Sequence, residues 1–131
     1  MGTVINSKKK VKDIISWFEI PAITFQQAVS FYNHIFGINM TTISNSIQTM
    51  AFFPTIGGVG GAIVCGPGSI PNENGPLVYL NGGKDLNIIL SKVEEAGGRV
   101  IMPKTAIGND AGFFAIFLDT EGNKLALHSK S

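Results

Sequence analysis

The chain has 131 residues, a formal net charge of +1, and 15% charged residues. This length supports one domain with a real hydrophobic core but not two independent domains. A net charge so close to zero creates no bulk field toward nucleic acid or an anionic membrane, so neither is expected as a partner.

Residues 1–13 are expected to form an N-terminal tail, because the basic run at 8–12 is typical of a solvated terminus. No apolar stretch approaches the roughly 20 residues that a membrane span needs, and the N-terminus lacks the apolar core of a signal peptide. A single cysteine, Cys65, excludes an intramolecular disulfide and is typical of a reducing compartment. We therefore expect a cytoplasmic protein.

The first predicted elements are a strand and an amphipathic helix. Residues 14–20 form an apolar strand that ends at Pro21. Thr24 is then expected to cap the helix, with Gln27 in the position that completes a capping box. Apolar residues follow at helical spacing, and Gly37 is the expected left-handed residue at the end of the helix.

Three strands follow this helix. Residues 38–44 and 47–53 are predicted to pair as a β-hairpin, and residues 62–65 form the next strand. The stretch 66–76 is rich in Gly, Pro and Asn and is expected to link two halves of the domain.

The second half repeats this order. A strand at 77–81 precedes a helix that is expected to be capped at Asp85 and to end at Gly97. The next strand, 99–102, is expected to stop at Pro103.

A glycine-containing loop is expected at 105–112, followed by strands at 113–118 and 124–128. Lys104 and Asn109 flank this loop, where they could meet an anionic substrate or simply be solvated.

The two halves share landmarks at constant spacing, which indicates an internal duplication. Trp17 corresponds to Leu77, and Gly37 corresponds to Gly97, in each case 60 residues later (77 − 17 and 97 − 37). Residues 14–66 and 75–130 therefore predict an α+β domain, 14–130, built from two βαβββ modules. The sheets of two such modules must be covered by each other or by a second chain, and the space between them is the natural place for a ligand.

Common catalytic and nucleotide-binding motifs are missing. The sequence contains no G-x-x-x-x-G-K-[ST], C-x-x-C, H-E-x-x-H or G-x-S-x-G pattern. The glycine-rich run 57–61 joins two predicted strands and does not open a helix, which argues against phosphate binding. Function therefore depends on which side chains share the ligand-facing side of the sheets.

Three segments resemble the vicinal oxygen chelate superfamily, which includes glyoxalase I, extradiol dioxygenases and bleomycin-binding proteins. Residues 28–37 (AVSFYNHIFG) are similar to its A-x-x-F-Y-x-x-x-F/L-G helix, 93–98 (VEEAGG) to its second helix end, and 117–123 (FLDTEGN) to its F-x-D-P-x-G-N turn. The resemblance implies a cup-shaped half-barrel, the glyoxalase/bleomycin resistance/dioxygenase fold, and commonly a homodimer with a shared or nearby site.

The resemblance also implies a divalent metal site with four ligands from the first and last strands of both modules. The corresponding positions here are Trp17, Cys65, Leu77 and Ala126. Three of these four side chains cannot bind a metal, and one thiolate lacks partners. No metal cofactor is therefore expected.

Strand alternation extends this set, because residues two apart on a strand share a face. If Trp17 faces the ligand, so does Glu19, and the same argument adds Tyr79 and His128. The expected ligand-facing set is aromatic with a few polar groups, as in many small-molecule sites. Its members are Trp17, Glu19, Met50, Phe52, Cys65, Tyr79, Phe114 and His128.

Glu19 and His128 are the candidate catalytic pair. An unpaired buried carboxylate on an apolar strand is costly, and a histidine would stabilise it. Such a pair could transfer protons, bind a polar ligand group or be purely structural; alternatively, Glu19 is an exposed edge residue. Cys65 is expected to pack as a small apolar side chain, and His34 to lie on the surface.

Three functions remain open. The first is metal-independent binding of a small organic molecule, and the second is a lyase or isomerase with Glu19 and His128 as acid and base. The third is a metalloenzyme with relocated ligands at Glu19, His128 and Cys65.

Overall fold

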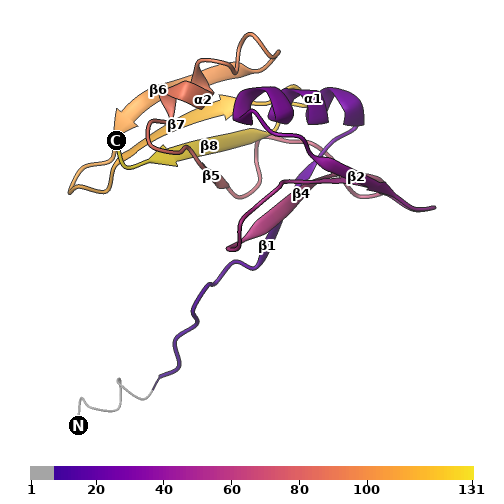
Figure 1. Cartoon of the computed structure of the whole chain (residues 1–131), viewed down its shortest axis with the longest axis horizontal. Coiled ribbons are helices and arrows are strands. Elements are labelled where there is room, and N and C mark those ends of the chain that lie inside the picture. Colours follow the sequence, from indigo (N-terminus) through magenta and orange to yellow (C-terminus); the bar gives the residue numbers. More distant parts are fainter. Residues whose placement is uncertain (1–7) are drawn as a thin grey trace.

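The computed structural model describes residues 8–131. It consists of two βαβββ modules, each with one four-stranded sheet (Figure 1). The first module contains β1 (Trp17–Pro21), α1 (Phe25–Phe36), β2 (Thr41–Ser44), β3 (Thr49–Phe52) and β4 (Gly60–Cys65). The second contains β5 (Tyr79–Asn81), α2 (Asn87–Leu90), β6 (Arg99–Ala106), β7 (Phe113–Leu118) and β8 (Lys124–Ser129).

The two sheets have equivalent topologies, which confirms the predicted α+β duplication. Their strand orders are β1-β4-β3-β2 and β5-β8-β7-β6. In each sheet the first and last strands of the module are parallel neighbours, and the other pairs are antiparallel. The tail expected at residues 1–13 falls partly outside the described residues, and residues 8–16 extend away from both sheets (Figure 1).

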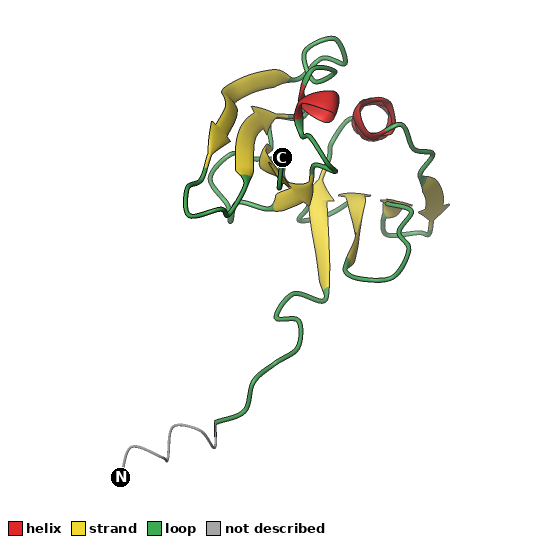
Figure 2. Cartoon of the chain, turned by 60° about the vertical axis from the view of Figure 1, so that its left-hand side comes forward, coloured by secondary structure: helices red, strands yellow, loops and turns green. Residues whose placement is uncertain are grey.

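Both helices lie on the same side of the molecule (Figures 1 and 2), and both contribute buried residues to the main core. Each sheet contributes one face to this core, and α1 contributes Phe31 and Tyr32, which are at most 1% exposed. Burial of each such large side chain stabilises the fold by about 2 kcal/mol. The sheet residues in the core include Ile20, Ala51, Ile63, Leu80, Ala115, Leu125 and Leu127.

Helix α1 ends as the sequence predicts but begins differently. Gly37 closes it in the left-handed conformation (φ 65°). The expected capping box at Thr24 is wrong, because its side chain makes no capping bond. Instead, Glu121 Oε1 accepts hydrogen bonds from the backbone N–H groups of Ile23 (2.6 Å) and Thr24 (2.8 Å). Glu121, which is distant in sequence, thus accepts the Thr24 N–H that the Gln27 side chain would accept in a capping box.

Glu121 belongs to the turn between β7 and β8, which joins the two modules. The buried Asp119 carboxylate accepts a hydrogen bond from Tyr32 Oη (2.7 Å) and bonds from the N–H groups of Glu121 and Asn123 (2.9 Å each). Asn123 Nδ2 donates to the carbonyl of Pro21 (2.8 Å). Burial of Tyr32, followed by the Asp119 charge, raises the pKa of the phenol well above its usual value.

The second helix is much shorter than the sequence predicts. Helix α2 covers Asn87–Leu90, and residues 91–97 continue as turns. Backbone bonds such as Lys92 N–H to Ile89 O connect residues three apart, as in a 3₁₀-helix. Asp85 does act at its start, because Asp85 Oδ1 accepts the N–H of Asn87 (3.0 Å).

Strand β6 passes through Pro103, so the predicted stop at that residue is wrong. β6 is an edge strand and therefore has a neighbouring strand on one side only. An edge strand tolerates proline, because an N–H that points away from the neighbouring strand makes no hydrogen bond within the sheet. Its pairing with β7 shifts register between Met102 and Thr105, which accommodates the proline. Strand β1, by contrast, begins later than predicted at Trp17, the first residue with a partner on β4.

No helix in the part of the chain that the structure describes is both long and apolar enough to cross a membrane.

Candidate functional site

The side of each sheet that does not face the main core is called the open face below. On the first sheet, Glu19 is paired with Ala62, and Ala62 with Phe52, so all three share a face. Trp17 lies on the same face, paired with Gly60. The members of the open face of this sheet are Trp17, Glu19, Pro21, Thr41, Ile43, Met50, Phe52, Gly60, Ala62 and Val64.

Trp17 forms the main aromatic surface of the first sheet. Its indole lies so close to Gly60 that a Cβ added to this glycine would be 3.1 Å from the ring. The Trp17 and Phe52 ring centroids are 6.0 Å apart. Indole Nε1 donates a long hydrogen bond to Glu19 Oε2 (3.3 Å). Trp17 is 44% exposed, so a large aromatic surface is available for contact.

The open face of the second sheet combines aromatic and polar side chains. Tyr79 is paired with Ala126, while Asn81 and Phe114 are both paired with His128. The Tyr79 and Phe114 ring centroids are 6.4 Å apart, and Tyr79 is 53% exposed. This face therefore presents an aromatic pair next to an amide and an imidazole.

The position of the His128 proton follows from its partner. His128 Nε2 lies 2.8 Å from the carbonyl oxygen of Ala111, which can only accept a hydrogen bond. Nε2 therefore carries a proton, and Nδ1 is the nitrogen that can accept a proton or bind a ligand. The contact depends on Gly112 (φ 93°), because a Cβ there would lie 2.4 Å from the Ser129 carbonyl oxygen and 3.2 Å from His128 Nε2.

A hollow of about 460 Å³ lies at the end of β5 and β8. Its volume is in the range of small-molecule sites. It is lined by Tyr79, Leu80, Asn81, Gly83, His128, Ser129 and Lys130.

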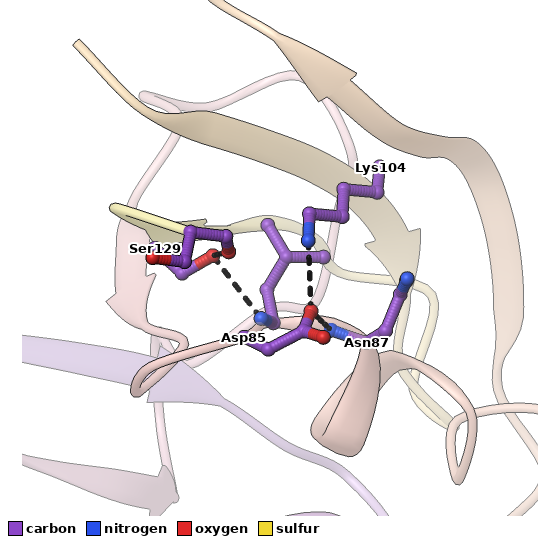
Figure 3. A network of polar contacts seen from close by, with 6 residues as sticks. Asp85, Asn87, Lys104 and Ser129 are labelled. Atoms are coloured by element: carbon purple, nitrogen blue, oxygen red, sulfur yellow. Dashed lines mark hydrogen bonds and ion pairs between the residues drawn. The ribbon is translucent and has the colours of Figure 1, made fainter. Parts of the chain in front are cut away.

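Ser129, one of the residues that line this hollow, belongs to the polar network shown in Figure 3. Lys104 Nζ donates to Asp85 Oδ1 (2.9 Å), and the N–H of Leu86 donates to Ser129 Oγ (3.1 Å). The Lys104 hydrogen bond, followed by that from the Asn87 N–H, lowers the pKa of the Asp85 carboxyl. Lys104 Nζ also lies 4.6 Å from the centre of the Phe113 ring, so it is held by several contacts and is not a free loop cation.

One expectation from the sequence differs from the structure. Cys65 is paired with Thr49 and lies on the core-facing side of its sheet, with Sγ 3.7 Å from the carbonyl oxygen of Ile23. It therefore does not share the open face with Trp17, contrary to the ungapped placement. Within one chain, Glu19 bonds to Trp17 and His128 to the Ala111 carbonyl, and no hydrogen bond or ion pair joins the two side chains. A Glu19–His128 pair between two subunits stays a prediction.

The remaining side chains considered in the sequence have structural surroundings. His34 Nε2 lies 2.6 Å from Glu95 Oε2, with both side chains at least half exposed, which links α1 to the segment after α2. Asn109 adopts a left-handed conformation (φ 52°) in the loop that carries Ala111. Neither contributes to the hollow.

The register also redefines the four positions at which the resemblance places metal ligands. Glu19–Ala62 in the first sheet is equivalent to Tyr79–Ala126 in the second, so Ala62 and not Cys65 corresponds to Ala126. Trp17, Ala62, Leu77 and Ala126 offer no metal-binding atom. In residues 8–131, no three His, Cys, Asp or Glu side chains come close enough together to hold a metal ion. The side chains of Trp17, Ala62, Leu77 and Ala126 therefore supply no ligand for the divalent metal that the resemblance implies.

Comparison with known proteins identifies the family. The model of the Glyoxalase/Bleomycin resistance protein/Dioxygenase superfamily matches residues 14–127, which covers both modules. The chain belongs to this superfamily. A glyoxylase-like domain-containing protein from Didymella fabae is 31% identical over 123 residues, covering 86% of this chain and 91% of that protein.

Solved structures show the same fold at low sequence identity. A glyoxalase/bleomycin resistance protein from Albidiferax ferrireducens is 13% identical (TM-score 0.63), covering 89% of this chain and 98% of its own. An antibiotic-binding protein from a Streptomyces species is 18% identical (TM-score 0.61), covering 94% and 100%. A glyoxalase I mutant from Zea mays is 14% identical (TM-score 0.67), covering 94% of this chain but 48% of the maize chain.

Asn81 and Lys130 are among the five residues of the hollow that the sequence did not predict as site residues. Lys130 follows β8 and lines the hollow with His128, two residues earlier. Asn81 is paired with His128 across the parallel strands. Alternation from Tyr79 to Asn81 and from His128 to Lys130 already contained this signal. What was missing was the knowledge that the two strand ends lie side by side.

Proposed function

We propose that the protein binds a small aromatic or apolar organic molecule on the open face of its sheets, without a divalent metal. The observation that carries this proposal is the presence of two partly exposed aromatic pairs, Trp17–Phe52 and Tyr79–Phe114, one on each sheet. Exposed aromatic side chains bury a large area on contact at a small entropic cost. Partly polar surroundings on the second sheet would orient a bound molecule.

The side chains at the positions implied for metal ligands support binding without a metal. Alanine occupies the two equivalent positions on β4 and β8, and both side chains are fully buried. Purified protein is expected to contain no stoichiometric zinc, nickel, manganese or iron. Elemental analysis that finds about one metal per chain would contradict this expectation.

Similarity to known binding proteins supports the same proposal. The Streptomyces neighbour is described as an antibiotic-binding protein, and this chain shares its fold over nearly the full length of both. The matching superfamily also includes bleomycin resistance proteins. Small-molecule binding is thus described for a protein that shares this fold.

A second copy of the chain is the proposed partner. The open faces expose apolar side chains, including Ile43 (56% exposed) and Tyr79 (53%). Covering this surface in a homodimer would remove apolar area from water. Light scattering at micromolar concentration should give the mass of a dimer, and a monomer alone would contradict the proposal.

The binding test uses the single tryptophan as a reporter. Because Trp17 is the only tryptophan and lies on the open face, a ligand there should quench or shift its emission. Aromatic compounds that raise the melting temperature should also change Trp17 fluorescence, and Phe52→Ala should weaken both responses. Ile88→Ala is the control, because Ile88 is exposed on α2, away from both open faces. Unchanged emission with every stabilising compound would argue against this site.

Acid–base chemistry is the second candidate, supported by His128 Nδ1, which makes no hydrogen bond to any residue that the structure describes. Among residues 8–131, the Glu19 carboxylate bonds only to Trp17, so a Glu19–His128 pair would have to form between two subunits. A lyase or isomerase reaction would then be lost in both Glu19→Gln and His128→Asn. If both variants retain ligand binding and any turnover, the two side chains are not an acid–base pair.

A further inference from the structure

The hollow on the second sheet differs from the rest of the open face in its polar groups. Three nitrogen-bearing side chains border it, from Asn81, His128 and Lys130. Among residues 8–131, no carboxylate side chain lines it. Within the described residues Lys130 makes no ion pair, in contrast to Lys104, whose charge is matched by Asp85.

The amide of Asn81 is oriented by its own loop. Asn81 Oδ1 accepts the backbone N–H of Gly83 (2.9 Å). Because the amide oxygen is used in this way, the Nδ2 group is the part that remains to donate to a ligand. Asn81 and Lys130 therefore both offer donors, and ionised acceptors make the strongest hydrogen bonds with them.

The backbone around these donors is tightly held. The N–H of Gly82 donates to the carbonyl oxygen of His128 (2.6 Å), and a Cβ on Gly82 would lie 2.7 Å from that oxygen. Ser129 Oγ fixes Leu86 on the other side (Figure 3). The Asn81 amide, which bonds to Gly83 beside this segment, therefore needs little reorganisation when a ligand binds.

An aromatic surface adjoins the donors. Tyr79 lines the hollow, and its ring packs beside Phe114 on the same face. A flat ring can therefore contact Tyr79 while an acidic substituent reaches the nitrogen groups of Asn81 and Lys130. His128 Nδ1 can adapt to either kind of substituent, since it accepts a hydrogen bond when neutral and donates one when protonated.

We infer that this hollow selects aromatic carboxylates, with Tyr79 contacting the ring and Asn81 and Lys130 binding the carboxylate. The inference rests on the proposed function, because it names the ligand class of the same open face. The first sheet has no equivalent set of donors: Pro21 and Val64 occupy the positions that correspond to Asn81 and His128.

The test compares naphthoate with naphthamide, which share the ring system and differ in charge, by isothermal titration calorimetry on the full chain. Naphthoate should bind about tenfold more tightly, as expected when charge-assisted hydrogen bonds replace neutral ones. Lys130→Gln and Asn81→Leu should each reduce this ratio, whereas Tyr79→Leu should weaken both compounds alike. Lys124→Gln is the matched control, because Lys124 is an exposed lysine at the opposite end of the same strand.

The outcomes separate this inference from the proposed function. Equal affinity for the two compounds, with both weakened by Tyr79→Leu, overturns carboxylate selection and leaves aromatic binding intact. An equal loss of the ratio in Lys124→Gln and Lys130→Gln also overturns it, since the effect would then be one of net charge. Failure of both compounds to bind, together with no Trp17 response to any aromatic compound, overturns both proposals.

Discussion

The two modules have the same strand pairing but different chemistry on their open faces. Glu19 is paired with Ala62 in the first, and Tyr79 with Ala126 in the equivalent place of the second. Two residues further along, Pro21 and Val64 are replaced by Asn81 and His128. The backbone scaffold is thus duplicated while the polar groups are concentrated at one end of the second sheet.

This difference shows that the backbone pairing alone does not define the site. Both sheets have a buried alanine at the centre of the open face, Ala62 in the first and Ala126 in the second. Function then depends on the residues that surround these two alanines. The following predictions test how far the two modules depend on each other and how far they differ.

The largest expected loss of stability comes from removing Asp119, the buried acceptor in the turn that joins the modules. Asp119→Ala would leave Tyr32 Oη and the turn N–H groups without their buried acceptor, which should lower the free energy of unfolding by about 3 kcal/mol. Urea denaturation measures this change. The control is Glu73→Ala, an exposed carboxylate elsewhere, and a similar small effect for both variants would contradict a shared core held by the turn.

Exchanging the side chains at the equivalent positions Val64 and His128 tests whether the two modules differ in the polar groups that they accept there. Val64→His places a polar ring at a site that is 3% exposed and should cost about 2 kcal/mol. His128→Val loses only the bond to the Ala111 carbonyl and should cost about 1 kcal/mol. If Val64→His is the better tolerated of the two, position 64 of the first module accepts polar groups. The proposed chemical difference between the two modules would then be wrong.

Substitutions in the loop that contacts His128 should lower stability by a smaller amount. The loop contains two glycines, Gly112 and Gly108, of which the second serves as the control. Gly112 and Gly108 both have positive φ (93° and 97°), but only at Gly112 would a Cβ meet the backbone, at the Ser129 carbonyl. Gly108→Ala should cost about 1 kcal/mol from backbone strain, and Gly112→Ala about 1 kcal/mol more. Thermal unfolding of the two variants measures the difference. Equal destabilisation would indicate that the loop does not need its close approach to β8.

Tyr32 links α1 to the turn and predicts a response to alkaline pH. Its folded pKa is raised, so above about pH 10 the unfolded chain loses this proton before the folded chain does. The unfolded state then binds fewer protons, and the free energy of unfolding falls as the pH rises. Tyr32→Phe should be less stable at neutral pH by about 1 kcal/mol but should lack this contribution to the slope. Denaturation from pH 8 to 11 makes the comparison, and parallel slopes would contradict it.

The smallest effect concerns Asp85 and Lys104, found only in the second module. The folded pKa of Asp85 is lowered, so its contribution to stability is present above about pH 4 and is lost as the pH falls through the folded pKa. The small stability difference between the wild type and Lys104→Met should therefore vanish in acid. Lys84→Met provides the control for loss of one positive charge, because Lys84 is exposed and forms no ion pair with any residue that the structure describes.

Elements defined by local signals were predicted well. Helix α1 has an amphipathic pattern and a closing glycine, and β7 is a continuous apolar run, so both lie where the sequence placed them. Helix α2 was predicted too long, because residues 91–97 form turns despite similar apolar spacing. β6 was predicted too short, because the effect of Pro103 depends on whether its strand lies at an edge.

The candidate site was predicted only as far as alternation allows. Alternation relates Trp17 to Glu19 and Tyr79 to Asn81 within one strand, and these pairs share the open face. It cannot relate one strand to another, since that requires the register between them. Cys65 was therefore placed on the wrong face by an ungapped count along the chain.

The sequence by itself determined the duplicated α+β fold, because apolar periodicity and glycine positions are local properties of the chain. It also predicted that three of the four positions at which the resemblance places metal ligands, Trp17, Leu77 and Ala126, lack a metal-binding atom. Only the tertiary structure decided that Glu121 caps α1, that His128 bonds to Ala111, and that Asn81 and Lys130 border one hollow. Those contacts join residues far apart in sequence, and their geometry depends on strand register and on how the two modules pack.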